Sequence, residues 1–170
     1  MVEKILDLIA VFFHSQWGFI AFIAVSVLLI YSLSRHRKVF LIALILALLL
    51  SSGLKVFLNQ ERPCVSVDSQ ISCPESNGFP SNHAVLASIS ALGAWGTILF
   101  APYLIIAFVI ALSRVWIGVH TVDQVAGGFA FGVMIFLAVW QVHEKFFGRK
   151  EKYDLDALFE ENLLTKTYRD

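Results

Sequence analysis

The sequence predicts an all-α fold, a polytopic membrane helical bundle of about five transmembrane helices preceded by an interfacial N-terminal helix. Three observations lead to this fold class. Hydrophobic residues make up 58% of the chain and charged residues only 15%. The mean hydropathy is +0.74, and a soluble domain of 170 residues rarely has this composition. Finally, the apolar residues gather in runs close to the roughly 20 residues that a helix needs to cross a bilayer.

The elements follow one another along the chain. Residues 2–13 are apolar, but this stretch is too short to span and contains charges, which favours a helix lying in the membrane interface. The expected spans are residues 17–33, 39–58, 83–100, 102–119 and 125–142. Residues 148–170 have mixed charge and apolar residues spaced for one helical face. We therefore expect a cytoplasmic amphipathic tail after a membrane-embedded domain of residues 1–147.

The basic loops predict the orientation of these spans. Arg35, Arg37 and Lys38 lie between the first two spans, and Lys145 begins a second basic cluster after the fifth. Loops rich in Lys and Arg stay on the cytoplasmic side of a membrane. With this topology, the loop of residues 59–82 and the turn of residues 120–124 both lie on the extracytoplasmic face of the cell membrane.

Three polar fragments lie at the extracytoplasmic ends of the apolar runs. They are Lys55 followed after six residues by Arg62-Pro63, then Pro80-Ser81-Asn82-His83, then Ser113-Arg114 followed after five residues by His120. A charge at the edge of the hydrocarbon costs free energy unless it is paired or hydrated. Their convergence on one face indicates a shared anionic ligand, and phosphate is the best candidate.

The order and spacing of these fragments resemble the motifs of the type 2 phosphatidic acid phosphatase superfamily. The resemblance covers about residues 55–128. It implies an all-helical enzyme that hydrolyses a lipid phosphate or diphosphate at the membrane surface without a metal or another cofactor. The implied partners are the lipid substrate and the surrounding membrane lipids, with no role for nucleic acid. The sequence does not determine the oligomeric state.

The chemistry of phosphate cleavage asks for the same cations. Arg62 and Arg114 each carry a planar guanidinium that can fork two hydrogen bonds onto phosphate, while Lys55 adds a point charge. Ser81 and the backbone N–H of Asn82 would add donors if a helix begins there and its N-terminus faces the anion. We therefore assign these five residues to phosphate binding.

Two histidines complete the predicted site. By resemblance, His120 is the nucleophile that forms a phosphohistidine intermediate, and His83 is the general acid and later the base for the attacking water. His120 must then be neutral and His83 protonated, which predicts a bell-shaped dependence of the rate on pH. By contrast, we expect His14, His36 and His143 to be interfacial residues without function.

Two residues depart from the family pattern. Asn82 stands where the family usually has Gly, and Gln124 stands where it usually has the Asp that orients the nucleophile. We favour Asp123 as the orienter of His120, which requires the turn to shift by one residue. The alternative is that the amide oxygen of Gln124 accepts the ring N–H.

Gln at this position, together with His120-Thr121, resembles the dolichyl diphosphate phosphatases and favours a polyprenyl diphosphate as substrate. A phosphatidylglycerophosphate or phosphatidic acid phosphatase remains an alternative, as does a non-catalytic binder or transporter of anionic lipids. Cys64 and Cys73 lie in one polar loop. They form a disulfide if that loop faces an oxidising compartment and are otherwise two free thiols.

Overall fold

The computed structural model describes residues 2–65 and 72–148, so the expected tail after residue 148 lies outside the described residues. The chain divides into two compact units, Met1–Phe136 and Leu137–Asp170. The first unit contains every residue assigned above to the site.

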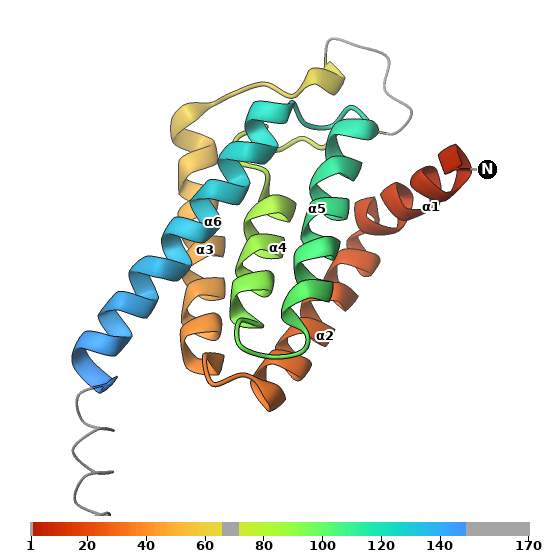
Figure 1. Cartoon of the computed structure of the whole chain (residues 1–170). Helices are drawn as coiled ribbons and strands as arrows, with labels where there is room; N and C mark the ends of the chain where they lie inside the picture. The colour runs from red at the N-terminus through yellow and green to blue at the C-terminus, as the bar shows by residue number, and fades with distance from the viewer. Residues whose placement is uncertain (1, 66–71, 149–170) are drawn as a thin grey trace, which may run out of the picture. The chain divides into compact units, whose positions relative to one another are not determined.

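The described residues are helical throughout apart from turns and loops, which confirms the predicted all-α class (Figure 1). The α-helices are α1 (Val2–His14), α2 (Gln16–Leu33), α3 (Arg37–Leu58), α4 (Asn82–Gly93), α5 (Phe100–Trp116) and α6 (Val122–His143). Two short elements accompany them, the 3-10 helix η1 (Pro63–Val65) and the π-helix η2 (Glu144–Gly148).

Helices α2, α3 and the segment Val122–Phe147 are each long and apolar enough to cross a membrane. Helix α5 is equally apolar but has 17 residues. Helix α4 departs from the expected span of residues 83–100, because it has 12 residues and ends at Gly93. The chain then turns through Gly96, whose φ of +75° belongs to the left-handed region that glycine adopts without strain. The number of spans therefore stays a prediction.

Helix α4 is the buried centre of the first unit, and small residues make this possible. Nearly all of its side chains are buried, and it packs against α2, α3 and α5. Helix α6 reaches α4 through two glycines. A Cβ atom on Gly128 would come within 2.7 Å of the Ser81 carbonyl oxygen, and one on Gly132 within 2.5 Å of that of Val85. The absence of side chains on these two glycines lets the two helices approach closely.

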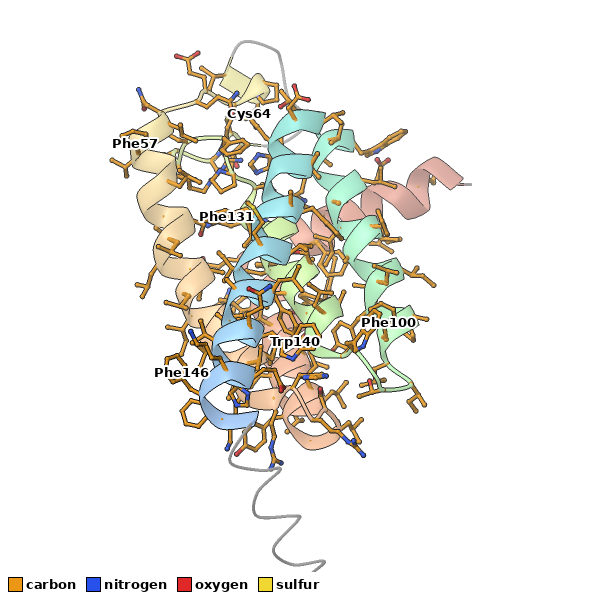
Figure 2. The ribbon with its side chains drawn as sticks, turned by 60° about the vertical axis from the view of Figure 1, so that its left-hand side comes forward. Phe57, Cys64, Phe100, Phe131, Trp140 and Phe146 are labelled. Atoms are coloured by element: carbon orange, nitrogen blue, oxygen red, sulfur yellow. A yellow bond between two sulfur atoms is a disulfide. The ribbon has the colours of Figure 1, made fainter. Side chains whose placement is uncertain are left out.

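Large apolar side chains cover the outside of the first unit. Leu28, Ile45, Leu49, Phe57 and Ile105 are all exposed, and Figure 2 shows Phe57 pointing away from the helices. In water such a surface would drive aggregation, but in a bilayer it faces hydrocarbon. The exposed apolar residues and the three long apolar helices identify the chain as an integral membrane protein.

Helices α3 and α5 end, and α4 and α6 begin, at the same end of this unit (Figure 1). An up-and-down course of the chain therefore brings the last turn of α3, the first turn of α4 and the loop between α5 and α6 together. All three predicted fragments lie in these segments.

Candidate active site

The three fragments meet around a cavity of about 180 Å³. It is lined by His14, Lys55, Arg62, Pro74, Ser76, Asn82, His83, Arg114, Val119 and His120. Of the residues predicted for the site, only Ser81 and Asp123 do not line the cavity. Three cations and two of the predicted histidines therefore share one space.

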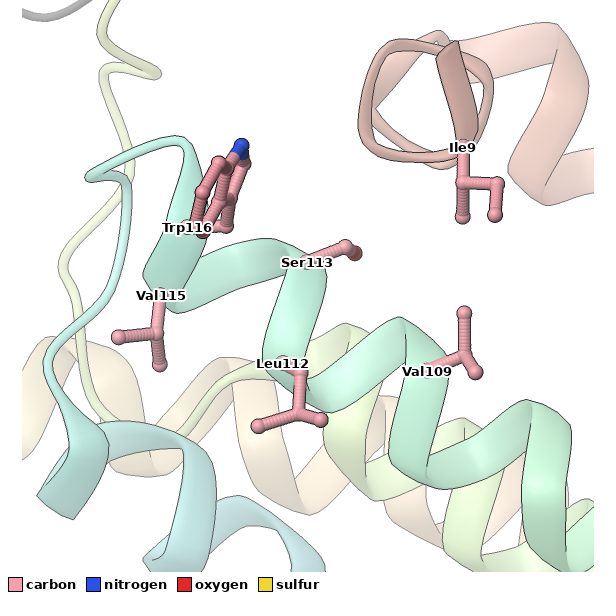
Figure 3. A pocket seen from close by; sticks show the side chains of 6 residues that line it. All are labelled: Ile9, Val109, Leu112, Ser113, Val115 and Trp116. Carbon is pink, nitrogen blue, oxygen red and sulfur yellow. The ribbon is translucent and has the colours of Figure 1, made fainter. Parts of the chain in front are cut away.

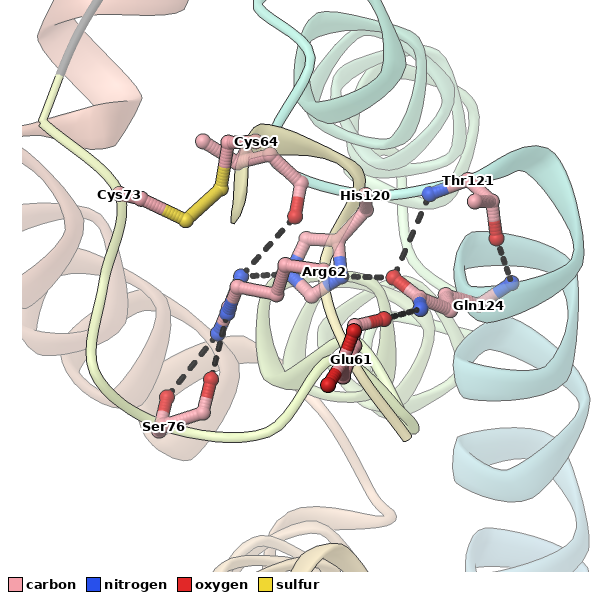
Figure 4. The surroundings of a disulfide bond; sticks show 9 residues. Glu61, Arg62, Cys64, Cys73, Ser76, His120, Thr121 and Gln124 are labelled. Carbon is pink, nitrogen blue, oxygen red and sulfur yellow. Dashed lines mark hydrogen bonds between the residues drawn. A yellow bond between two sulfur atoms is a disulfide. The ribbon is translucent and has the colours of Figure 1, made fainter. Parts of the chain in front are cut away.

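Arg62 connects the loop before α4 to the nucleophile candidate (Figure 4). Its Nε donates to the Ser76 carbonyl oxygen at 2.6 Å, and its Nη2 donates to Ser76 Oγ at 3.0 Å. Its Nη1 donates to the Val119 carbonyl oxygen at 3.1 Å and lies 2.9 Å from Nε2 of His120. The guanidinium is thus buried and already positioned at the atom that would attack phosphorus.

His120 is held from its other side by Gln124. Nδ1 of His120 lies 3.0 Å from Oε1 of Gln124, and Nε2 of Gln124 donates to the Glu61 carbonyl oxygen at 2.8 Å. Because the amide NH₂ must face a carbonyl, the amide oxygen must face the histidine. Nδ1 therefore carries the proton, and Nε2 presents its lone pair to the cavity and to Arg62.

The expectation that Asp123 orients His120 is corrected by this geometry. Asp123 is exposed, whereas Gln124 is fully buried. Successive residues of an α-helix are rotated by about 100°, so only one of the two can face His120. Thr121 decides which one, because its Oγ1 accepts from the N–H of Gln124 and its own N–H donates to Gln124 Oε1, both at 3.3 Å. This reciprocal pair is a capping box, and the Thr-x-x-Gln spacing is a sequence signal that predicts it.

The environment of His120 favours the neutral ring. Burial and then the charge of Arg62 lower the pKa of His120 to about 3, although the hydrogen bond to Gln124 acts in the opposite direction. A neutral imidazole with an unprotonated Nε2 is the form that can attack phosphorus.

Lys55 is fixed by a reciprocal pair with the same loop. Its Nζ donates to the Asn77 carbonyl oxygen at 2.6 Å, and Asn77 Nδ2 donates to the Lys55 carbonyl oxygen at 2.9 Å. The pair ties the last turn of α3 to the segment before α4. Both cations from the first fragment are thereby held by residues 76 and 77.

Arg114 is directed toward the N-terminal helix. Its Nη2 donates to the Ala10 carbonyl oxygen at 2.8 Å, and its Nη1 donates to that of Phe13 at 3.3 Å. Ser113 Oγ accepts from Arg114 Nε at 3.2 Å and donates to the Ile110 carbonyl oxygen at 2.7 Å. Ser113 therefore positions Arg114 and bonds back to its own helix.

The first turn of α4 supplies further polar groups. Asn82 and His83 are its first two residues, and their backbone N–H groups belong to the turn that has no intrahelical partners. Ser81 Oγ and Asn82 Oδ1 are buried without a hydrogen-bond partner among the described residues. The ring of His83 lies against that of Phe19, with 4.0 Å between centroids. The N–H groups of a helix N-terminus and the unpaired Ser81 hydroxyl are donors that suit an anion.

Cys64 and Cys73 form a disulfide, with Cα atoms 5.6 Å apart, so the alternative of two free thiols is set aside. Cys64 packs in a buried cluster with Ala10, Ile117 and Val119. The bridge therefore holds the segment after Cys73, which includes the cavity residue Ser76, beside the stretch of chain that leads into His120.

Two cavity residues with polar side chains were missed by the sequence interpretation. Ser76 carries no signal beyond its place in the loop between the first two fragments. His14 was expected to be interfacial without function, yet it lines the cavity. No spacing rule connects His14 to the fragments, because a complete helix, α2, separates it from them in sequence.

Apolar space adjoins the polar cavity. Figure 3 shows a pocket of about 500 Å³ between α1 and α5, where Ile9 faces Val109 and Ser113. A second pocket of about 490 Å³ shares Ile9 and Val109 and extends to α2. Ser113, which lines the first apolar pocket, accepts a hydrogen bond from Arg114, which lines the polar cavity. The apolar pocket therefore lies next to the polar cavity.

The fold and the site define an integral membrane protein with a cation-lined cavity built by three separate fragments. A family model described as the PAP2 superfamily matches residues 37–147. The chain therefore belongs to the PAP2 superfamily, as the three fragments predicted. Among the described residues, no three His, Cys, Asp or Glu side chains are grouped to hold a metal ion.

Two particular relatives can be named. The chain is 30% identical over 110 residues to phosphatidylglycerophosphatase B of Bacillus subtilis (strain 168). This match covers 57% of this chain and 53% of that protein. The match thus spans about half the length of the relative. The fold is similar to the crystal structure of the first transmembrane PAP2 type phosphatidylglycerolphosphate phosphatase from Bacillus subtilis. That likeness has a TM-score of 0.63 and 21% identity, and covers 84% of this chain and 78% of that one.

Proposed function

We propose that this protein is a metal-independent membrane lipid phosphatase that converts a polyprenyl diphosphate to its monophosphate through a phosphohistidine intermediate. One observation carries the proposal. Lys55, Arg62 and Arg114 share a small cavity with His83 and His120. Three cations in a partly desolvated space fit a multiply charged phosphate, and two histidines supply a nucleophile and a proton donor.

The size of the cavity supports a headgroup site. Its volume of about 180 Å³ is below the 300 Å³ or so that whole small-molecule ligands occupy. The apolar pockets beside Ser113 offer about 500 and 490 Å³. A phosphate in the cavity and a hydrocarbon chain along α5 would therefore suit an amphiphilic substrate.

The first chemical step uses the tautomer that Gln124 enforces. Arg62 Nη1 leaves Nε2 of His120 for a phosphate oxygen, which frees the lone pair. Nε2 attacks phosphorus, the N–P bond forms, and the bond from phosphorus to the leaving oxygen breaks. His83 donates its proton to that oxygen, so the leaving group departs with one negative charge fewer.

The second step reverses the proton transfer. The neutral His83 accepts a proton from a water molecule as its oxygen attacks phosphorus, and the N–P bond breaks. Its electron pair returns to Nε2 of His120 and inorganic phosphate is released. Both histidines end in their starting protonation states.

Two observations bear on the choice of lipid. The contact of Gln124 with His120, together with Thr121 directly after His120, supports a polyprenyl diphosphate as substrate. This combination resembles the dolichyl diphosphate phosphatases. The phosphatidylglycerophosphatase relative supports phosphatidylglycerophosphate as the second candidate.

The test is phosphate release by the purified protein in detergent with EDTA present. Polyprenyl diphosphate, phosphatidylglycerophosphate and phosphatidic acid are compared for the wild type, His120→Ala and His36→Ala. Turnover that is lost only in His120→Ala supports the proposal. Turnover that survives in His120→Ala contradicts the phosphohistidine, and metal dependence contradicts the rest of the scheme.

The wild type and His120→Ala, together with Arg62→Ala, distinguish the proposed phosphatase from a non-catalytic binder of anionic lipids. A binder would lose affinity for its lipid in Arg62→Ala but keep it in His120→Ala, and the wild type would release no phosphate.

We also propose that the site lies on the extracytoplasmic face, which is supported by Arg35 between α2 and α3 and by Arg37 and Lys38 at the start of α3. Glu75 is exposed in the loop beside the cavity. A Glu75→Cys variant in intact cells should react with a membrane-impermeant thiol reagent. If the reagent labels the variant only after the cells are opened, the site lies on the cytoplasmic face instead.

A further inference from the structure

The C-terminal end of α1 forms one wall of the phosphate cavity. His14, the last residue of α1, lines this cavity beside the motif residues. It lies outside residues 37–147, the part of the chain that the family model matches. Any role of His14 is therefore additional to the three fragments that define the family.

Several hydrogen bonds among the described residues fix the end of α1, and none of them uses the His14 side chain. Arg114 donates to the carbonyl oxygens of Ala10 and Phe13. Ser15 donates through Oγ to the Phe12 carbonyl oxygen at 2.7 Å and through its N–H to that of Val11 at 2.9 Å. Replacing the imidazole leaves this anchoring in place.

The position of His14 within the cavity follows from its neighbours. His83 and Arg114 both reach the backbone of Phe13, the residue before His14. His14 interacts electrostatically with Arg114, Arg62 and His83. Because Phe13 directly precedes His14, the contacts of His83 and Arg114 with the Phe13 backbone place His14 beside the general acid.

That side of the cavity receives the leaving group. The atom that His83 protonates is the leaving oxygen, so a side chain beside His83 meets whatever this oxygen is attached to. In a lipid diphosphate it is attached to a second, charged phosphate. In phosphatidic acid or phosphatidylglycerophosphate it is attached to carbon, and the one further charge, the phosphodiester of phosphatidylglycerophosphate, lies across the glycerol.

We propose that His14 determines specificity by donating a hydrogen bond to the second phosphate of a diphosphate headgroup. This inference rests on the proposed lipid phosphatase activity and deepens it. Lys55, Arg62 and Arg114 serve the phosphate that is transferred, and His14 is an additional donor for the phosphate that leaves. Burial, followed by the charges of Arg114 and Arg62, lowers the pKa of His14. The neutral ring at pH 7 still has one N–H to donate.

The test compares His14→Phe, which keeps a ring but has no donor, with His14→Gln, which keeps an N–H donor. His36→Ala is the matched control, since His36 precedes the start of α3 and Lys55 lies near its end, about 27 Å further along that helix. The value of kcat/KM is measured on polyprenyl diphosphate and on phosphatidylglycerophosphate.

We expect His14→Phe to lower kcat/KM on the diphosphate about tenfold, the effect of one hydrogen bond to a charged group. On phosphatidylglycerophosphate it should change kcat/KM by less than about twofold. His14→Gln should recover most of the loss, and His36→Ala should match the wild type. An equal loss on both substrates would mean a structural role, and no loss on either would remove the proposal.

A binding measurement separates failure of this inference from failure of the proposed activity. Inorganic pyrophosphate and inorganic phosphate are titrated by calorimetry into the wild type and His14→Phe. A selective loss of pyrophosphate affinity, about tenfold, supports the role of His14 even if the wild type turns over neither lipid. Equal affinities in the two proteins overturn it, whatever the turnover.

Discussion

Replacing Gln124 by glutamate gives the sharpest test of the His120 geometry. The amide oxygen of Gln124 lies 3.0 Å from Nδ1 of His120 and carries no charge. In Gln124→Glu a carboxylate would occupy this place. Two unit charges about 4 Å apart attract by about 4 kcal/mol at an effective dielectric constant of about 20. That energy is about a thousandfold in proton affinity.

The substitution should therefore raise the pKa of His120 from about 3 to about 6. It should also cost about 1–3 kcal/mol of stability, because the Glu61 carbonyl oxygen loses its donor and faces a carboxylate oxygen. In the proposed mechanism a protonated His120 cannot attack phosphorus, so the variant should become inactive in mild acid where the wild type still works.

The assay is the pH dependence of kcat/KM, which reports groups of the free enzyme. Ionisation of the substrate phosphate affects both proteins alike, so the ratio of Gln124→Glu to wild type isolates the enzyme. We expect this ratio to be flat above about pH 6 and to fall about tenfold per pH unit below it. Asp123→Asn, at the exposed neighbouring position, is the control and should leave the ratio to wild type flat.

A flat ratio for Gln124→Glu down to about pH 4.5, in a protein with a normal melting transition, would refute the reasoning. It would mean that Gln124 does not contact His120 in the working enzyme. A falling ratio in Asp123→Asn would restore Asp123 as the orienter.

Three further predictions concern stability and the loop. Gly132→Ala should destabilise the detergent-solubilised protein by about 1–3 kcal/mol, because its Cβ would meet Ser88 and the Val85 carbonyl oxygen. The control is Gly53→Ala, which lies in open space on α3 and should be neutral or slightly stabilising in thermal unfolding. The double variant Cys64→Ser, Cys73→Ser should lose about 3 kcal/mol of unfolding free energy, because the bridge spans nine positions. It should also lower kcat/KM by loosening Ser76, and an unchanged rate would mean that the bridge does not affect the site. The pKa of His120 is about 3 in the folded protein, below the ordinary histidine value of 6.5, so protonation favours the unfolded chain. Its contribution to stability should be present above about pH 6.5 and be lost as pH falls toward about 3; a His120→Gln variant should show a shallower fall in Tm over that window, and an identical fall would contradict the shift.

The sequence alone determined the fold class and most of the site. Runs of apolar residues near the length of a membrane span specify helices, because a backbone in hydrocarbon must satisfy its own hydrogen bonds. The spacing of the motifs identified the three cations and two histidines that share the cavity, namely Lys55, Arg62, His83, Arg114 and His120. Charges at the ends of apolar runs are costly unless they share a ligand, so they carry information that no packing pattern has.

Other features depended on contacts between segments distant in sequence. Helix α4 ends at Gly93 and the chain turns through Gly96, whereas hydropathy extended this span to residue 100. Arg114 turned toward carbonyl oxygens of α1, and His14 entered the cavity, because the end of α1 lies against α5.

The choice between Asp123 and Gln124 shows the same division at one residue. Either side chain can orient a histidine, so residue type and spacing left both open. The tertiary structure decided, because the Glu61 carbonyl oxygen and the Thr121 capping box fix the direction of the Gln124 amide. Composition and periodicity determine which segments enter the membrane, whereas the rotation of each helix about its axis, and hence which side chain faces the cavity, is set by partners that only the folded chain brings together.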